Sequence, residues 1–198
     1  TTPVVVPDPS PVPSIPAVMV TDVGTAVHDL VVDGESIWAT LPDQNRVSEL
    51  DTADLDEQRR ILVGTHPRGI DLLDDGKLAV ALGDSTGYVE VDPATEDLHT
   101  ITLPLLGAPE TWDVANIGND IVLVSSNPGS GGIAYIVRVD RSDGWSSTRV
   151  ADDKIIRAGP RFADAGSTVL IGEGFSPNSL YRLDTTDPAL PIAAEDNR

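Results

Sequence analysis

The chain has 198 residues, of which 32 are acidic and 13 are basic, so its formal net charge at pH 7 is −19. This charge argues against nucleic acid and anionic membranes as partners, because binding to phosphate groups depends on clustered lysine and arginine. Cysteine is absent, which excludes disulfide bonds and thiolate chemistry, and no apolar stretch is long enough to insert into a membrane as a helix.

The N-terminal segment is rich in proline. Residues 1–16 contain six prolines and no basic residue. Because proline lacks an amide donor and favours extended backbone, this segment is predicted to form a stiff tether. Two interpretations stay open, a stalk between a surface domain and its anchor and an interdomain linker. Residues 17–26 follow as a lead-in with one isolated strand candidate, Ala17–Val20.

Short strand-like segments separated by turn sequences fill the chain from Val27 onward. Turn dipeptides such as Asp33-Gly34 and Gly118-Asn119 mark the connections. No segment carries an apolar period of 3.6 residues over a dozen positions, so almost no helix is expected. The clearest strand candidates are 28–32, 36–40, 46–50 and 59–63, then 69–73, 77–82, 88–91 and 99–103, and later 121–125, 134–139, 168–172 and 179–183.

An aspartate that follows an apolar residue and opens a turn occurs four times, at Asp51, Asp92, Asp140 and Asp184. The intervals are 41, 48 and 44 residues, and a period of this length with strand patterning is typical of a propeller or solenoid. A short carboxylate at the first position of a turn accepts backbone amides two or three residues further on. Each aspartate is therefore predicted to fix the hairpin between the third and the outer strand of its unit.

The repeat divides the chain into four units, each expected to form one antiparallel sheet of four strands. Their bounds are about 27–65, 66–108, 109–153 and 154–198. The predicted fold class is all-β, a β-propeller of four-stranded blades. The stretch from His66 to Val80, with its continuation from Gly87 to Thr95, resembles the repeat of YVTN/NHL-type β-propellers.

Propellers of this family usually have about six to eight blades, and this sequence holds four units and one additional strand candidate. The resemblance therefore implies part of a larger ring, either a fragment or a half ring that a second propeller half or another copy completes. The resemblance is specific for the fold and weak for function, since such propellers serve as enzymes, scaffolds and binding modules.

Two glycine-rich loops have partial catalytic motifs. Gly83–Gly87 has the G-x-S-x-G spacing of a nucleophile elbow around Ser85. A strand rather than the required helix is predicted after it, which favours a hairpin loop. The loop 125–132 lacks the lysine of a phosphate-binding loop. An elongated hairpin connection is the favoured interpretation there, with a flexible ligand-contacting loop as the alternative.

No cofactor is predicted, and calcium stays open. The three histidines, His28, His66 and His99, fit no metal-ligand spacing. Carboxylate oxygens suited to calcium are plentiful, but Asp74–Gly76 and Asp140–Asp143 lack the alternating spacing of a calcium loop. Both segments are interpreted as ordinary turns.

The candidate binding residues follow from the propeller interpretation, in which the loops that enter the inner strands share one face around the channel mouth. This rim would contain His28, Asp29, His66, Arg68, Glu110, Trp112, Asp113, Arg157 and Arg161, with Asp43, Asn45, Asp84, Asn127 and Asn178 added by other loops. The tryptophan could anchor a ligand or fill space between blades. The arginines could bind a carboxylate or only neutralise neighbouring aspartates.

Several functions compete. The proline-rich tether, the acidic, lysine-poor composition and the lack of a convergent catalytic set favour a non-catalytic, secreted or cell-surface module. It would bind a protein or glycan, or act as a scaffold, and its location would be extracellular or at the cell surface. The alternative is a propeller enzyme of the metal-dependent lactonase or quinone-dependent dehydrogenase type, with Glu110, Asn127 and Asp29 as residues that could be recruited. A structural fragment of a larger enzyme is the third interpretation.

Overall fold

The computed structural model describes residues 20–106, 110–127, 133–150, 156–157, 159–164, 168–172, 180–187 and 192–195. The regular structure in these ranges is β-strand, apart from two single 3₁₀ turns, η1 (Pro42–Gln44) and η2 (Pro104–Leu106). The proline-rich residues 1–16 lie outside the described ranges, as do the first three residues of the strand candidate Ala17–Val20. Within the described ranges, no helix is both long and apolar enough to cross a membrane.

Four antiparallel sheets of four strands, which we call blades 1 to 4, follow one another along the chain. Blade 1 consists of β1 (Leu30–Asp33), β2 (Ser36–Leu41), β3 (Arg46–Asp51) and β4 (Glu57–Leu62). Blade 2 consists of β5 (Pro67–Leu72), β6 (Leu78–Leu82), β7 (Gly87–Val91) and β8 (Leu98–Thr102). Blade 3 consists of β9 (Thr111–Asn116), β10 (Ile121–Ser126), β12 (Ile136–Asp140) and β13 (Ser146–Val150). Blade 4 consists of β15 (Arg161–Asp164), β16 (Thr168–Gly172), β17 (Leu180–Asp184) and β18 (Ile192–Glu195).

The predicted all-β fold class is confirmed, and so is the order of four short strands in each unit. One strand differs from its prediction: the segment 134–139 is not continuous. Its first part belongs to β11 (Ile133–Ala134), which pairs with β14 (Ile156–Arg157) in a separate two-stranded sheet. The break occurs at Tyr135, whose amide and carbonyl both bond to Ser126. The exact bounds of the four units stay predictions.

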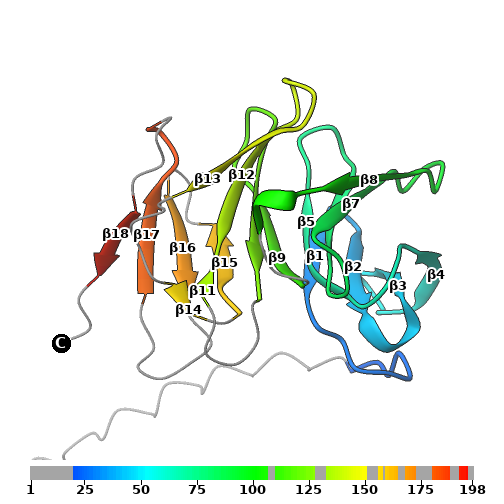
Figure 1. Ribbon diagram of the computed structural model, residues 1–198. Helices are drawn as coiled ribbons and strands as arrows, with labels where there is room; N and C mark the ends of the chain where they lie inside the picture. The colour runs from blue at the N-terminus through cyan, green and yellow to red at the C-terminus, as the bar shows by residue number, and fades with distance from the viewer. Residues whose placement is uncertain are drawn as a thin grey trace, which may run out of the picture.

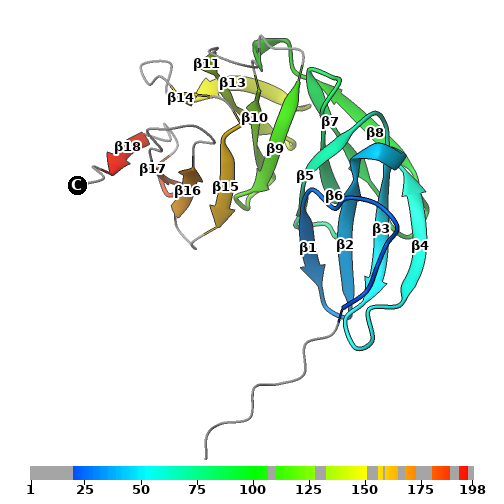
Figure 2. The same cartoon turned by 90° about the horizontal axis from the view of Figure 1, so that it is seen from below.

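The blades are arranged side by side along an arc, with the first strand of each blade on the inside. Figure 1 shows blade 1 on the right and blade 4 on the left, and Figure 2 shows the arc from below. Strand β1 lies beside β5, β5 beside β9, and β9 beside β15. The inner strands therefore line a shared channel, and residues that precede or begin them gather at one end of it.

Apolar side chains between neighbouring blades form the core. Strand residues alternate between the two faces of a sheet, so each blade presents one apolar face to each neighbour. Trp38, with 2% of its surface exposed, packs between blades 1 and 2. Further clusters lie between blades 2 and 3, around Leu103 and Val122, and between blades 3 and 4, around Leu123 and Ile171.

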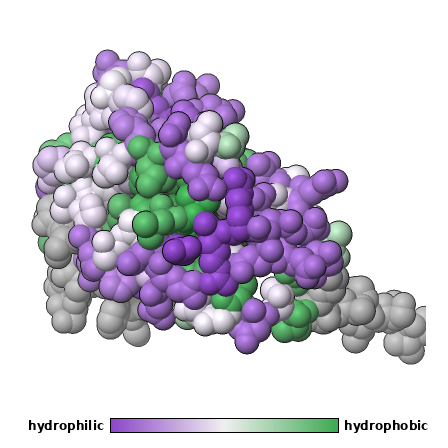
Figure 3. Space-filling view, turned by 90° about the vertical axis from the view of Figure 1, so that its right-hand side faces the viewer, coloured by the Kyte–Doolittle hydropathy of each residue, from purple (hydrophilic) through white to green (hydrophobic). Residues whose placement is uncertain are grey.

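Blade 1 has one face without a neighbouring blade. Leu30 and Val32 on this face are each 55% exposed. The chain before β1 crosses the sheet in Figure 2, and Arg60 of β4 donates to the carbonyl of Val23 over 2.9 Å. The side on which β4 and β8 lie is mostly polar, with one apolar area in its middle (Figure 3). Among the described residues, no further blade therefore covers the arc at the end formed by blade 1.

The four turn aspartates have the predicted role. Asp51 accepts the amide of Ala53, Asp92 that of Ala94, Asp140 that of Asp143 and Asp184 that of Thr186, over 2.7 to 3.2 Å. In each case the carboxylate closes the turn that leads from the third strand to the outer strand. The repeated residue is therefore explained by hairpin geometry.

We expect Asp92→Ala to lower the free energy of unfolding by about 0.5–2 kcal/mol, as for other lost side-chain caps of backbone amides. The substitution leaves the amides of Ala94 and Thr95 without their acceptor. Urea unfolding of the variant and the parent measures the difference. Asp92→Asn is the matched control, since it keeps an acceptor oxygen and should cost much less; equal losses in the two variants would contradict the turn role.

Candidate functional site

Four of the predicted rim residues come together at the end of the channel where the inner strands begin, and we call them the mouth cluster: His28, Arg68, Trp112 and Arg161. One comes from each blade. The guanidinium of Arg68 lies over the Trp112 ring, 4.8 Å from its centre. The His28 ring meets Trp112 edge-on at 5.2 Å, and its Nε2 lies 3.2 Å from a guanidinium nitrogen of Arg161.

The mouth cluster contains three buried nitrogen atoms for which the described part of the chain supplies no hydrogen-bond partner: His28 Nδ1, Arg68 Nε and Trp112 Nε1. Arginine can only donate, so the contact with Arg161 requires His28 Nε2 to be the acceptor. The proton of a neutral His28 then sits on Nδ1. All three unpartnered atoms are therefore N–H donors, and the complement that they lack is an acceptor.

Electrostatics keep His28 neutral. Burial lowers the pKa of His28 below its ordinary value, and the positive charges of Arg161 and Arg68 lower it further; a contact with the Arg68 backbone and the charge of Asp29 oppose this fall. The contact with the backbone does not reach hydrogen-bond geometry at Nδ1. A neutral imidazole agrees with the hydrogen-bond geometry. The positive charge of the mouth cluster is thus carried by the two guanidinium groups, with the imidazole as a donor beside them.

Asp29 and Asp113 each join two neighbouring blades. Asp29 accepts the amide of Ile70 in blade 2 over 3.1 Å, and Asp113 accepts the amide of Phe162 in blade 4 over 2.7 Å. A Cβ atom on Gly69 would lie 2.7 Å from the Asp113 Cα. Glycine is therefore required there for the close approach of blades 2 and 3. These rim aspartates have a structural role that the sequence did not reveal.

Below the mouth, the inner strands enclose a pocket of about 180 Å³, lined by the carboxylates of Asp29, Asp71, Asp113 and Asp164. Burial raises the pKa of Asp113 to about 7; the Phe162 amide opposes this rise and the charge of Asp29 adds to it. The pKa of Asp71 is raised too, again chiefly by burial. Asp113 is thus a carboxyl group that changes protonation state near neutral pH.

The raised pKa makes stability depend on pH. The native state holds a proton on Asp113 that the unfolded chain releases at about pH 4, so stability is full below that pH and is lost as the pH rises to about 7. Each pKa unit corresponds to about 1.4 kcal/mol, which gives a loss on the order of 4 kcal/mol. Between pH 5 and pH 8 about two pKa units of this shift are sampled, which gives a loss on the order of 3 kcal/mol in the parent. We expect Asp113→Asn to lack this loss when urea unfolding is measured at these two pH values.

His28 contributes a trend of opposite sign, because its pKa is lowered and its stabilising effect is present only above its ordinary pKa. This contribution is shared by the parent and the variant and cancels in the comparison. The same pH dependence in both proteins would show that Asp113 is not the titrating group.

The remaining rim residues lie in smaller contacts. His66 Nδ1 is 2.6 Å from an oxygen of Asp84, and both side chains are about half exposed. Asn127 donates to Glu110 over 2.9 Å. Arg157 belongs to β14 through its backbone, and its side chain lies outside the described residues, as does Asn178. The structure thus brings four of the nine predicted binding residues into one cluster.

The motif around Ser85 is a hairpin connection. Residues 83–86 join β6 to β7, and the carbonyl of Ser85 accepts both the amide and the hydroxyl of Thr111. No helix follows the serine, as the sequence predicted. Among the described residues, no three His, Cys, Asp or Glu side chains are grouped as they would be around a metal ion. Calcium stays the open alternative to the expectation of no cofactor.

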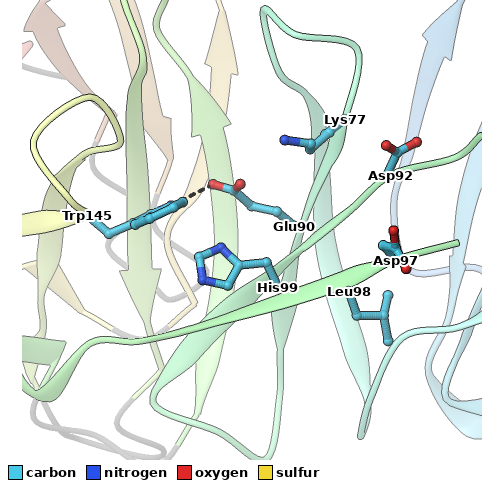
Figure 4. A pocket seen from close by; sticks show the side chains of 7 residues that line it. All are labelled: Lys77, Glu90, Asp92, Asp97, Leu98, His99 and Trp145. Carbon is cyan, nitrogen blue, oxygen red and sulfur yellow. Dashed lines mark hydrogen bonds between the residues drawn. The ribbon is translucent and has the colours of Figure 1, made fainter. Parts of the chain in front are cut away.

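A second concave site, which we call the outer pocket, was not predicted. Its volume is about 390 Å³. Trp145 forms one wall and is 37% exposed. The one sign of this pocket in the sequence was a tryptophan beside Gly144 in a surface turn. The other residues that line the pocket come from blade 2 and its turns. The pocket is lined by Lys77, Glu90, Asp92, Asp97, Leu98, His99 and Trp145 (Figure 4).

No family model and no curated protein matches the chain. Several solved structures are similar to it. Virginiamycin B lyase from Staphylococcus aureus is 17% identical with a TM-score of 0.67, over 90% of this chain and 58% of the lyase. Hydrazine synthase from Kuenenia stuttgartiensis is 14% identical with a TM-score of 0.66, over 92% and 53%. A gluconolactonase from Xanthomonas campestris is 15% identical with a TM-score of 0.62, over 80% and 58%.

The chain therefore spans little more than half the length of these neighbours. Identities this low carry the fold alone, since one fold serves many reactions. The neighbours include propeller-type enzymes, and the arrangement of four antiparallel blades agrees with theirs. The chain is thus a β-propeller protein.

Proposed function

We propose that this protein is a non-catalytic recognition module whose mouth cluster binds a carboxylate group carried by a protein or a glycan. The observation that carries the proposal is the set of three buried N–H donors without partners, beside two guanidinium groups. A carboxylate offers two acceptor oxygens and a negative charge, which this set lacks. In this proposal Trp112 anchors the ligand and the arginines bind its carboxylate.

The energetics favour a ligand of this class. A buried polar group without a partner costs about 1–3 kcal/mol, and a hydrogen bond to a charged group contributes about 1.5–3 kcal/mol. A carboxylate that pairs with the free donors would remove the first cost and add the second contribution. The net charge of −19 repels anions at long range, so affinity would depend on direct contact at the mouth cluster rather than on long-range attraction.

Calorimetric titration with glucuronate and with glutarate tests the proposal, since they present the carboxylates of an acidic sugar and of a glutamate side chain. Glucose is the matched neutral probe for glucuronate. We expect Arg161→Gln to weaken binding about tenfold or more, and Arg46→Gln, an exposed arginine in β3, to leave it unchanged. Equal binding of glucose and glucuronate, or equal affinity of both variants, would refute the carboxylate site.

The enzyme alternative is favoured by one observation, the raised pKa of Asp113 in the channel. A carboxyl group with a pKa of about 7 could act as an acid or a base at neutral pH, and the similar structures include a lyase and a gluconolactonase. Hydrolysis of gluconolactone, measured with and without added calcium, tests this alternative. Turnover that disappears in Asp113→Asn would favour the enzyme; no turnover in the parent would favour recognition.

We further propose that the repeats are of the YVTN/NHL type and that the module works outside the cell or at its surface. The stretch from His66 to Val80 supports the first point, and the proline-rich residues 1–16 support the second.

The open face of blade 1, with Leu30 and Val32 half exposed, supports a further blade as its partner. The solution mass decides this point: a monomer that binds no apolar dye would contradict a partner blade.

A further inference from the structure

We propose that the outer pocket is a binding site for an organic cation, an ammonium or guanidinium group. It is separate from the mouth cluster. Arg68 lies near the beginning of β5, whereas Asp92 follows the end of β7, and the strands between them run antiparallel. The two sites therefore lie at opposite ends of blade 2, and this inference does not depend on the proposed function.

The aromatic wall of the pocket is held in a fixed position. The indole N–H of Trp145 donates to Glu90 Oε1 over 3.0 Å, drawn as a dashed line in Figure 4, and the His99 ring meets the indole at 4.3 Å. The backbone of Trp145 has φ +58°, a left-handed conformation that a bulky residue rarely adopts. Backbone strain of this kind persists where the surroundings enforce it and is frequent at ligand sites.

Glu90 positions the wall rather than the ligand. Its side chain is 2% exposed, and its carboxylate also accepts from the Arg141 guanidinium over 2.8 Å and from the Tyr88 hydroxyl over 3.1 Å. Glu90 Oε1 thus already accepts three hydrogen bonds, and its acceptor capacity is fully used. The indole ring is consequently oriented before any ligand arrives, with part of its surface open to the pocket.

Negative charge without a partner faces the wall from the other side of the pocket (Figure 4). Within the described residues, no hydrogen bond or ion pair involves the Asp97 carboxylate, and Asp92 uses only Oδ1 for its turn amides. Lys77 is already paired with Asp75 over 3.0 Å. A pocket with a partly exposed indole, an unpaired carboxylate at Asp97 and a second carboxylate oxygen at Asp92 suits a cation, which is attracted by the electron-rich ring and by the carboxylates.

The size of the pocket limits the ligand. Ligand sites usually have volumes of about 300–1,000 Å³, and this pocket, at about 390 Å³, lies at the lower end. It fits a single amine or the end of one arginine or lysine side chain. The net charge of −19 would attract such a cation from solution as well.

The test is a titration with methylguanidinium, with N-methylurea as the neutral probe of nearly the same shape. Binding is followed by the indole N–H signals in a ¹H–¹⁵N NMR spectrum, assigned with tryptophan-to-phenylalanine variants. We expect methylguanidinium to shift the Trp145 signal to saturation and to leave the Trp112 signal in place, and methylurea to have no effect. Equal shifts from both probes would overturn the proposal.

Two variants sharpen the result. We expect Asp97→Asn to weaken methylguanidinium binding about fivefold or more, since it removes a carboxylate charge without changing shape. Glu35→Gln removes the same charge in an exposed turn of blade 1 and should leave the affinity unchanged; both variants should melt like the parent. Unchanged affinity in Asp97→Asn would overturn the site. Tighter binding of an arginine-containing peptide than of free agmatine would identify a protein partner as the source of the cation, and equal binding a free amine.

Discussion

Replacing Arg141 with methionine should lower the free energy of unfolding by about 3–5 kcal/mol, the usual cost of breaking a buried ion pair by removing one partner. The Arg141 side chain is 8% exposed and bonds to Glu90, Asp75 and Asp120 over 2.8 to 3.0 Å. Although burial alone would raise it, the pKa of Glu90 is lowered because Arg141 and Trp145 donate to its carboxylate. Without the guanidinium, Glu90 would be a buried charge with only neutral donors.

Urea unfolding at pH 7 measures the loss. The double variant with Glu90→Gln should regain part of it, because a neutral amide can stay buried at lower cost than an unpaired carboxylate. Arg46→Met, on an exposed arginine, is the matched control and should change stability little. A loss in Arg141→Met no larger than that in the control would show that the network between blades 2 and 3 does not stabilise the fold.

Gly69→Ala should destabilise the protein by about 3 kcal/mol or more, the upper range for added atoms in a packed region. The new Cβ would overlap the Asp113 carboxylate and would lie 2.7 Å from the Asp113 Cα. Movement of the side chain alone cannot relieve a backbone contact, so blades 2 and 3 would have to separate. Because Asp113 also bonds to Phe162, the disturbance should reach blade 4.

Gly172→Ala is the matched control for this substitution. Gly172 lies in strand β16, and a Cβ at this position would meet no atom of the described residues within 4 Å. Its substitution should be neutral or slightly stabilising, because alanine restricts the unfolded chain more than glycine does. Thermal melting of the two variants compares them directly. Equal melting temperatures would mean that the blades tolerate the separation and that the close approach at Gly69 is not required.

Local patterns in the sequence predicted the fold well. Turn residues such as Asp92 act through amides two or three positions away, so their role follows from the local sequence. Trp38 lies in the middle of a strand, where the alternation of the two sheet faces turns its side chain towards the neighbouring blade. The interruption at Tyr135 was missed, because it depends on pairing between 133–134 and 156–157, which no local pattern records.

The candidate sites could be predicted only in part. The common propeller arrangement placed His28, Arg68, Trp112 and Arg161 on one rim, and they do meet. Their unpartnered donors depend on exact distances, which the sequence does not contain. The outer pocket depends on contacts between residues 55 positions apart, Glu90 and Trp145. Such contacts arise from the packing of blades 2 and 3 and have no signature in either segment alone.

The indole N–H of Trp112 reports whether the mouth cluster holds free donors for a carboxylate. In a ¹H–¹⁵N spectrum recorded during a titration with glucuronate, we expect a downfield shift of the Trp112 signal as its proton gains an acceptor. The signals of Trp38, buried between blades, and of Trp145, already bonded to Glu90, should stay in place. A Trp112 signal that does not move at saturating glucuronate would refute a carboxylate site at the mouth cluster.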